Sequence, residues 1–170
     1  MRVLVGLLSL ASIGLGFCLA QEIAARKPSV YTDGLYGFSI RAPQFAATRD
    51  KTTVAPVMLL GPAVDGFSPN VSVMVQEGPM TREDYRTLSL GQFKQAKLEL
   101  TSQKDLTVGG KDAWLIEYTG QQKGTDLSFM ALAVFLGNRM FLVTCTDTKK
   151  DYPSIAAEFR ACIDSFSLAP

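Results

Sequence analysis

The chain has 170 residues, 47% of them hydrophobic, and contains no histidine. The lack of histidine removes the usual general base near neutral pH, the Ser-His and Cys-His nucleophile pairs and the commonest zinc ligand. Of the 17 Lys and Arg residues one, Arg2, lies in the first twenty positions, and the other 16 balance the 16 Asp and Glu residues. A balanced chain without basic clusters has no electrostatic basis for binding nucleic acid or an anionic bilayer.

The first twenty residues have the layout of a secretory signal peptide. Arg2 supplies a short positive region, 3–17 is almost unbroken apolar sequence, and small residues lead up to Ala20. The apolar run is about 15 residues long, shorter than the ~20 that a spanning helix needs, and no later segment comes close. We therefore expect an exported protein, periplasmic or secreted, cleaved after Ala20 and without a spanning helix in the mature chain.

Cys18 offers an alternative, in which this cysteine is acylated and anchors the mature protein. Bacterial lipoprotein signals favour a small residue before that cysteine, and here the bulky Phe17 precedes it. The sequence therefore favours a cleaved signal peptide at 1–20. The remaining chain, about 150 residues, is enough for one domain with a substantial core. We expect a flexible lead-in at 21–33 and a single domain at 34–168.

The first part of the domain predicts three strands. Apolar and polar residues alternate over 36–42, which is typical of a half-buried strand, and Pro43 ends the pattern. A short apolar strand is predicted over 57–60. A third strand, with alternating valines, is predicted over 70–77.

The period then changes to that of a helix. Thr81 and Asp84 form a capping-box pattern, in which a hydroxyl and a carboxylate three residues later each satisfy a free amide. The apolar residues behind it follow one stripe at helical spacing and predict the buried face: Tyr85, Leu88, Phe93, Ala96 and Leu100. Gly91 lies inside this helix and lowers its stability by up to ~1 kcal/mol relative to alanine.

The second half predicts antiparallel strands joined by short glycine-containing turns, over 106–108, 113–119, 127–136 and 140–146. The third of these is apolar at nearly every position, which indicates that both of its faces are covered. A second helix is predicted to begin near Asp151, with Pro153 in its first turn. Its predicted buried residues are Ile155, Phe159, Cys162, Ile163 and Phe166.

This order of elements predicts the fold class. Strands, a helix, a strand meander and a terminal helix indicate an α+β fold, with a mostly antiparallel β-sheet sandwiched by helices. We expect the protein to be a monomer.

Cys145 and Cys162 are the two cysteines of the mature chain. In an oxidising compartment an even number of cysteines favours a structural disulfide, here between the last long strand and the last helix. The chain-entropy model assigns ~3 kcal/mol to a loop of this length. The alternative is a pair of buried free thiols, which are common in apolar surroundings.

No motif for a catalytic, cofactor or metal site occurs in the sequence. Ser-x-x-Lys, Gly-x-Ser-x-Gly, EF-hand and dinucleotide-binding patterns are all missing. Gly109-Gly110-Lys111 lacks the upstream glycine of a phosphate loop and predicts a hairpin turn. The scattered acidic residues are typical of solvated turns. We therefore expect no enzyme, no cofactor and no metal, and a hydrolase with an atypical Ser-Lys or carboxylate site is the least favoured alternative.

Trp114 and Tyr118 lie in one of the predicted strands, and Phe129 and Phe135 lie in the next. Such aromatic side chains form either the core of a sheet or the lining of a ligand cleft between sheet and helix. The second arrangement would make the protein a small-ligand carrier.

Four segments carry a resemblance to a known family: 36–40 with the following proline, the valine strand 71–75 and its helix, the hairpin 110–118, and 163–166. Over roughly Tyr31 to Leu168 the chain resembles the PsbP-like superfamily. The resemblance implies an α/β/α layered sandwich that serves in binding or assembly, with partners that differ between members. No functional site of that family transfers residue by residue.

Together these features predict an exported, non-enzymatic binding or assembly protein of the cell envelope. Its partner is either an envelope protein or a small ligand, neither of which the sequence identifies.

Overall fold

The computed structural model describes residues 29–45, 48–50 and 55–169. The predicted signal peptide 1–20, with Cys18 and the cleavage site after Ala20, lies outside this part of the chain. Within these ranges, no helix is both long enough and apolar enough to cross a membrane.

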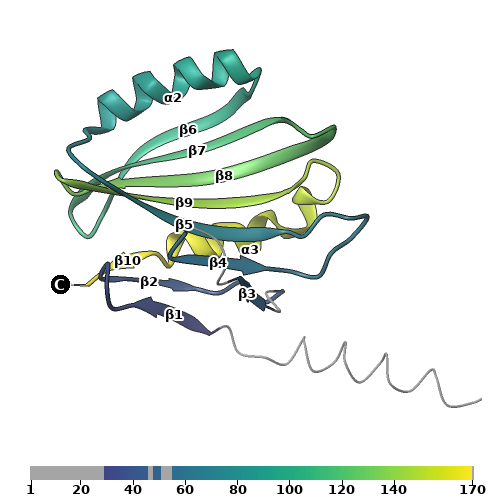
Figure 1. Cartoon of the computed structure of the whole chain (residues 1–170), viewed down its shortest axis with the longest axis horizontal. Helices are drawn as coiled ribbons and strands as arrows, with labels where there is room; N and C mark the ends of the chain where they lie inside the picture. Colours follow the sequence, from purple (N-terminus) through teal and green to yellow (C-terminus); the bar gives the residue numbers. More distant parts are fainter. Residues whose placement is uncertain (1–28, 46–47, 51–54, 170) are drawn as a thin grey trace, which may run out of the picture.

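A seven-stranded antiparallel sheet forms the centre of the molecule (Figure 1), in the order β3-β4-β5-β9-β8-β7-β6. Five of its six strand pairings join strands that follow one another in the sequence, and the sixth joins β5 to β9. The strands are β3 Thr48–Asp50, β4 Val57–Leu60, β5 Asn70–Glu77, β6 Glu99–Val108, β7 Lys111–Gln122, β8 Thr125–Phe135 and β9 Arg139–Thr148.

Two helices cover opposite faces of this sheet (Figure 1): α2, Arg82–Ala96, and α3, Tyr152–Asp164. Alternation along β7 divides the core accordingly, since Trp114 packs with the α2 side and Leu115 packs with the α3 side. This arrangement confirms the predicted α+β layered sandwich. It also confirms that the long apolar strand, now β8, is covered on both faces.

A second, small sheet packs beside α3, with the strand order β1-β2-β10. Its strands are β1 Val30–Asp33, β2 Phe38–Arg41 and β10 Ser167–Leu168. The end of the predicted flexible lead-in 21–33 is therefore strand β1, paired with β2. The sequence missed this strand because it is short and none of its residues is fully buried; Tyr31 packs against Phe38 of β2, with the ring centroids 5.9 Å apart.

Helix α2 begins as predicted, and its buried face differs from the predicted stripe at two positions. The hydroxyl of Thr81 accepts a hydrogen bond from the backbone N–H of Asp84 at 3.1 Å, which confirms the N-cap. Ser89 is the buried residue of the helix, whereas Leu88 is 49% exposed and Ala96 is also exposed. The predicted stripe was wrong at these two positions because the helix rests on the sheet along the line through Tyr85, Ser89 and Phe93.

Strand β6 is longer than predicted. The helix ends at Ala96, where Lys97 takes a left-handed conformation with φ of 55°, and β6 starts at Glu99. Leu100, expected on the helix, thus lies in β6 opposite Tyr118. The sequence did not predict the first part of this strand because 101–105 is polar; β6 is an edge strand whose side chains mostly face solvent.

Helix α3 follows the prediction closely. Phe159, Cys162 and Ile163 are buried on it, and Phe166 is buried just beyond its end. These residues pack against the valines of β5 and the α3 side of β8 and β9, and so form the larger of the two cores.

Candidate functional site

Trp114, one of the two residues expected in a ligand cleft, is a core residue. Its side chain is 0% exposed beneath α2. The ring of Tyr85 meets it edge-on with centroids 6.2 Å apart, and the guanidinium carbon of Arg86 lies 5.3 Å from its ring centroid. Packing therefore fills the space in which a ligand would contact this indole.

Tyr118, the second expected residue, is also packed on both sides. Phe93 from α2 and Phe129 from β8 each lie 4.6 Å from its ring centroid, and the Phe129 ring is stacked upon it. Burial raises the pKa of Tyr118 to about 12. A neutral phenol held between two rings has a structural role in this aromatic cluster.

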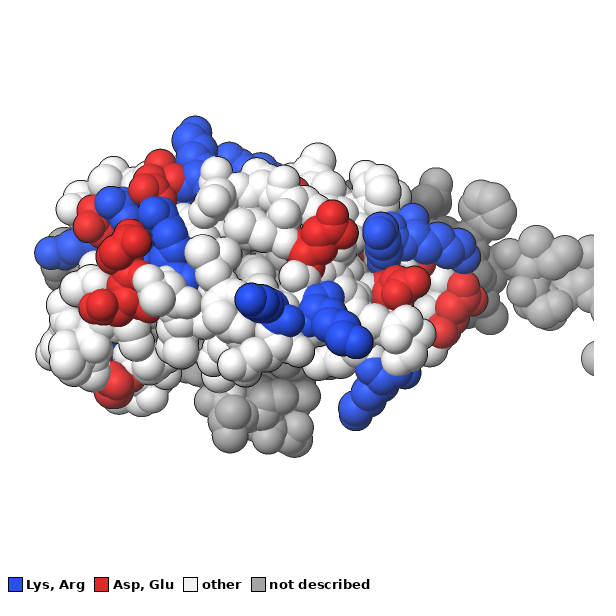
Figure 2. Space-filling model, turned by 90° about the horizontal axis from the view of Figure 1, so that it is seen from above, with Lys and Arg blue, Asp and Glu red and all other residues white. Residues whose placement is uncertain are grey.

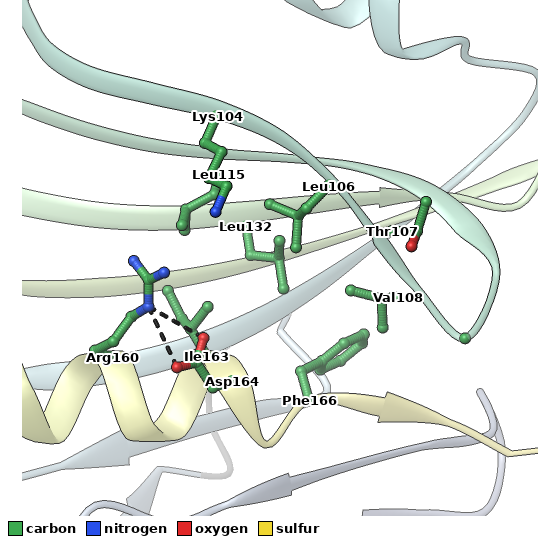
Figure 3. Close-up of a pocket in the computed structure, with 11 residues that line it drawn as sticks. Lys104, Leu106, Thr107, Val108, Leu115, Leu132, Arg160, Ile163, Asp164 and Phe166 are labelled. Carbon is green, nitrogen blue, oxygen red and sulfur yellow. Dashed lines mark hydrogen bonds and ion pairs between the residues drawn. The ribbon is translucent and has the colours of Figure 1, made fainter.

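A cavity of about 440 Å³ lies on the opposite face of the sheet, between the β6–β7 hairpin and the C-terminal half of α3 (Figure 3). The sequence placed its candidate ligand cleft on the other face, at Trp114 and Tyr118, because strand alternation does not reveal how far each helix covers its face. The cavity is lined by Lys104, Leu106, Thr107, Val108, Gly109, Leu115, Leu132, Arg160, Ile163, Asp164 and Phe166.

The cavity forms because α3 crosses β8 and β9 while the hairpin extends beyond the helix. Gly109 and Gly110, with φ of 55° and 74°, make the tight turn between Val108 and Lys111. Positive φ at both central residues is the requirement of a type I′ hairpin turn. This observation confirms the hairpin that the sequence predicted for the Gly-Gly-Lys segment.

Two basic residues border the cavity at one end. Lys104 from β6 and Arg160 from α3 extend toward each other across the gap between strand and helix (Figure 3). The Nε of Arg160 donates hydrogen bonds to Oδ1 and Oδ2 of Asp164, at 3.1 Å and 3.3 Å. Val108 and Phe166 lie at the other end (Figure 3).

A shallower hollow of about 360 Å³ lies where β6 meets α2, lined by Arg86, Leu90, Gln103, Lys104 and Asp105. Two of its charged residues are already paired with each other, since Arg86 bonds to Asp105, and Arg82 lies 3.8 Å from the same carboxylate. On the face that carries α2, basic and acidic side chains lie interspersed and neither sign forms a continuous patch (Figure 2). This face offers no field that would attract a polyanion or a polycation.

Cys145 on β9 and Cys162 on α3 are both buried free thiols. The two elements are in contact, because the Sγ of Cys145 lies 3.9 Å from the carbonyl of Phe159, one turn before Cys162. Burial raises the pKa of Cys145 well above its usual value, and burial with the nearby Glu158 raises the pKa of Cys162 to about 12. No disulfide joins these two residues in the structure, so the bridge stays a prediction from the sequence.

The carboxylates do not converge on a metal site. Over the described ranges, no group of three His, Cys, Asp or Glu side chains lies close enough to hold a metal ion. Asp147 is a buried carboxylate that accepts a hydrogen bond from the backbone N–H of Thr148 at 2.7 Å, and burial raises its pKa.

Three solved structures share this architecture. LpqN of Mycobacterium tuberculosis, involved in cell envelope biogenesis, aligns with a TM-score of 0.65 at 13% identity, covering 89% of this chain and 97% of its own. Cyanobacterial PsbP (CyanoP) from Synechocystis sp. PCC 6803 aligns with a TM-score of 0.62 at 16% identity, covering 95% of this chain and 98% of its own. PA94 of Pseudomonas aeruginosa, a protein of unknown function, aligns with a TM-score of 0.56 at 17% identity, covering 85% and 98%.

No family model and no curated protein matches the chain in sequence. The structural matches nevertheless show that the chain has the fold of the PsbP-like superfamily, as the resemblance implied.

Proposed function

We propose that this chain of PsbP-like fold is an exported, non-enzymatic binding or assembly protein of the cell envelope. The structural likeness to LpqN, which is involved in cell envelope biogenesis, supports a role in the cell envelope. The predicted signal peptide at 1–20 supports export.

The state of the reactive groups supports a role in binding. The thiols of Cys145 and Cys162 and the phenol of Tyr118 have raised pKa values, so each is protonated at neutral pH. A protonated, buried thiol is a poor nucleophile. The chain also has no histidine to serve as a general base.

The observation that carries the proposal is the apolar surface around α2. Leu88 and Leu90, which flank the buried line of the helix, are 49% and 41% exposed. Met74 of β5, which alternates with valines on the α3 side and so faces the α2 side, is 47% exposed. These three side chains leave apolar surface exposed on both flanks of α2 and on β5, and exposed apolar surface is typical of a site that binds another protein.

Site-specific photo-cross-linking in the cell envelope tests this role. A photoreactive residue placed at the exposed position Thr87 should capture one recurrent envelope protein. Leu88→Gln with Leu90→Gln should reduce that capture at least tenfold. Leu35→Gln is the matched control, because Leu35 is 80% exposed but lies in the turn before β2. Equal capture by all variants, or turnover of a substrate by the purified protein, contradicts the proposal.

The cavity beside α3 favours a second candidate, a small-ligand carrier. Its volume of about 440 Å³ lies within the range of about 300–1,000 Å³ typical of small-molecule sites. Native mass spectrometry of the protein purified from its own envelope should then show a bound small molecule. A uniformly ligand-free protein contradicts this candidate and leaves the protein-binding role intact.

A further inference from the structure

We infer that the cavity between the β6–β7 hairpin and α3 binds an amphipathic anion, a single aliphatic chain that ends in a carboxylate or phosphate. The inference rests on the second candidate function and names the class of ligand for it. Two properties of the cavity carry it: an apolar floor and a positively charged end (Figure 3).

The floor of the cavity is aliphatic and aromatic. Leu132 and Ile163 are buried side chains from β8 and α3, and Phe166 is buried beyond the end of that helix. Leu106 and Val108 of β6 are half-buried and complete the wall on the hairpin side. An alkyl chain lying here would remove these apolar surfaces from water, which is favourable by roughly 25 cal/mol per Å² of apolar area.

The charged end has cationic groups that the protein leaves available. No described carboxylate lies within ion-pair distance of the Lys104 ammonium. Arg160 uses its Nε for Asp164, and no described group accepts a hydrogen bond from its two terminal nitrogens. These terminal nitrogens extend toward the Lys104 side of the cavity (Figure 3).

The balance of charge favours an anion over a neutral or cationic ligand. Lys104 and Arg160 together outweigh Asp164, whose carboxylate is already bonded to Arg160 one turn earlier on the helix. An anionic head placed between the two cations would gain charge-assisted hydrogen bonds, and a guanidinium suits carboxylate and phosphate equally well. A cationic head would meet two like charges at the same end.

Titration of the full mature protein with four ligands of equal chain length tests the inference. Decanoate and decyl phosphate should produce saturable shifts of the methyl NMR signals of Leu106, Val108 and Ile163, and calorimetry should give the affinities. Decanol should bind at least tenfold more weakly, and decyltrimethylammonium more weakly still. Tighter binding of decanoate would indicate that the natural ligand carries a carboxylate, and tighter binding of decyl phosphate would indicate a phosphate.

Two variants and one control locate the site. Lys104→Gln with Arg160→Gln should abolish the preference for the anions over decanol, and Leu106→Trp should block all four ligands by filling the cavity. Lys94→Gln, on the exposed side of α2, should leave binding unchanged. Circular dichroism verifies that each variant is folded, and for the variants without an added tryptophan the fluorescence of Trp114, on the other face of the sheet, gives a second check.

Equal binding of decanol and decanoate overturns the inference, as does undiminished binding to Leu106→Trp. If none of the four ligands binds while the envelope-purified protein carries another small molecule, the ligand class is wrong and the carrier role stands. If none of the four ligands binds and the envelope-purified protein is ligand-free, the ligand class and the carrier role are both wrong.

Discussion

The guanidinium of Arg86 lies over the indole ring of Trp114, 5.3 Å from its centroid, and so joins helix α2 to the centre of the sheet. The same side chain bonds to Asp105 on β6. This contact adds to the ring contacts that Tyr85 and Phe93 of α2 make with the sheet. Trp114 is the sole tryptophan of the chain, so its fluorescence reports directly on that interface.

We expect Arg86→Ala to destabilise the protein by about 1 kcal/mol, the size of a partly desolvated cation–π contact. The tryptophan emission should also shift to longer wavelength, because the loss of the guanidinium opens the covered ring to water. Urea unfolding followed by fluorescence measures both effects. Lys94→Ala on the exposed side of α2 is the control and should change neither quantity. An unshifted spectrum in Arg86→Ala would show that α2 docks without this contact.

Gly91 offers a site for stabilisation. A Cβ at this position meets nothing within 4 Å, so the glycine serves no close approach to the sheet. We expect Gly91→Ala to raise the free energy of unfolding by about 0.5–1 kcal/mol, since alanine is the better helix former. Gly124→Ala is the matched comparison, because its Cβ is equally free but its φ is 85°. That variant should lose about 1 kcal/mol, and a similar loss in Gly91→Ala would contradict the prediction.

The fold was largely predictable because its signals are local. Thr81 caps α2 through a bond to a residue three positions away, and the unbroken apolar run of β8 reflects its burial on both faces. The predicted burial of Leu88 was wrong because the sequence of a helix with apolar residues on two flanks does not reveal which flank meets the sheet. The sequence also did not predict strand β1, because this strand is defined by its pairing with β2 and has little apolar alternation.

The candidate site was far less predictable. Lys104, Leu106 and Val108 alternate along one face of β6, and this pattern is visible in the sequence. What makes them line a cavity is the path of α3, which covers β8 and leaves the hairpin uncovered. Arg160 reaches the same cavity from a position more than fifty residues away in the chain. Periodicity within one element carries no information on such a meeting of distant elements.

Asp147 should make the stability of the protein depend on pH. Burial raises the pKa of this carboxyl above its ordinary 3.8, so in the interval between these two values the folded state binds more protons than the unfolded state. Stability therefore falls as the pH rises through this interval. We expect Asp147→Asn, which keeps an oxygen to accept the bond from Thr148, to be more stable than the parent at neutral pH. The difference should vanish below pH 3.8, which urea unfolding at a series of pH values measures. If the difference in stability between Asp147→Asn and the parent does not change with pH, the substitution acts through packing and the prediction is wrong.

The two cysteines should react only after the protein unfolds. Both thiols are buried, and the raised pKa of Cys145 and of Cys162, the latter to about 12, keeps them protonated at pH 8. We expect iodoacetamide to label the reduced, folded protein at least a hundredfold more slowly than the unfolded protein, as mass spectrometry over time will measure. Rapid labelling of the folded form would contradict their burial. The same assay on protein exported and purified without reductant tests the predicted disulfide, because release of two thiols per chain on unfolding rules it out. Absence of free thiols would instead show that oxidation after export joins β9 and α3, which are already in contact through the Cys145 sulfur and the Phe159 carbonyl, by a disulfide.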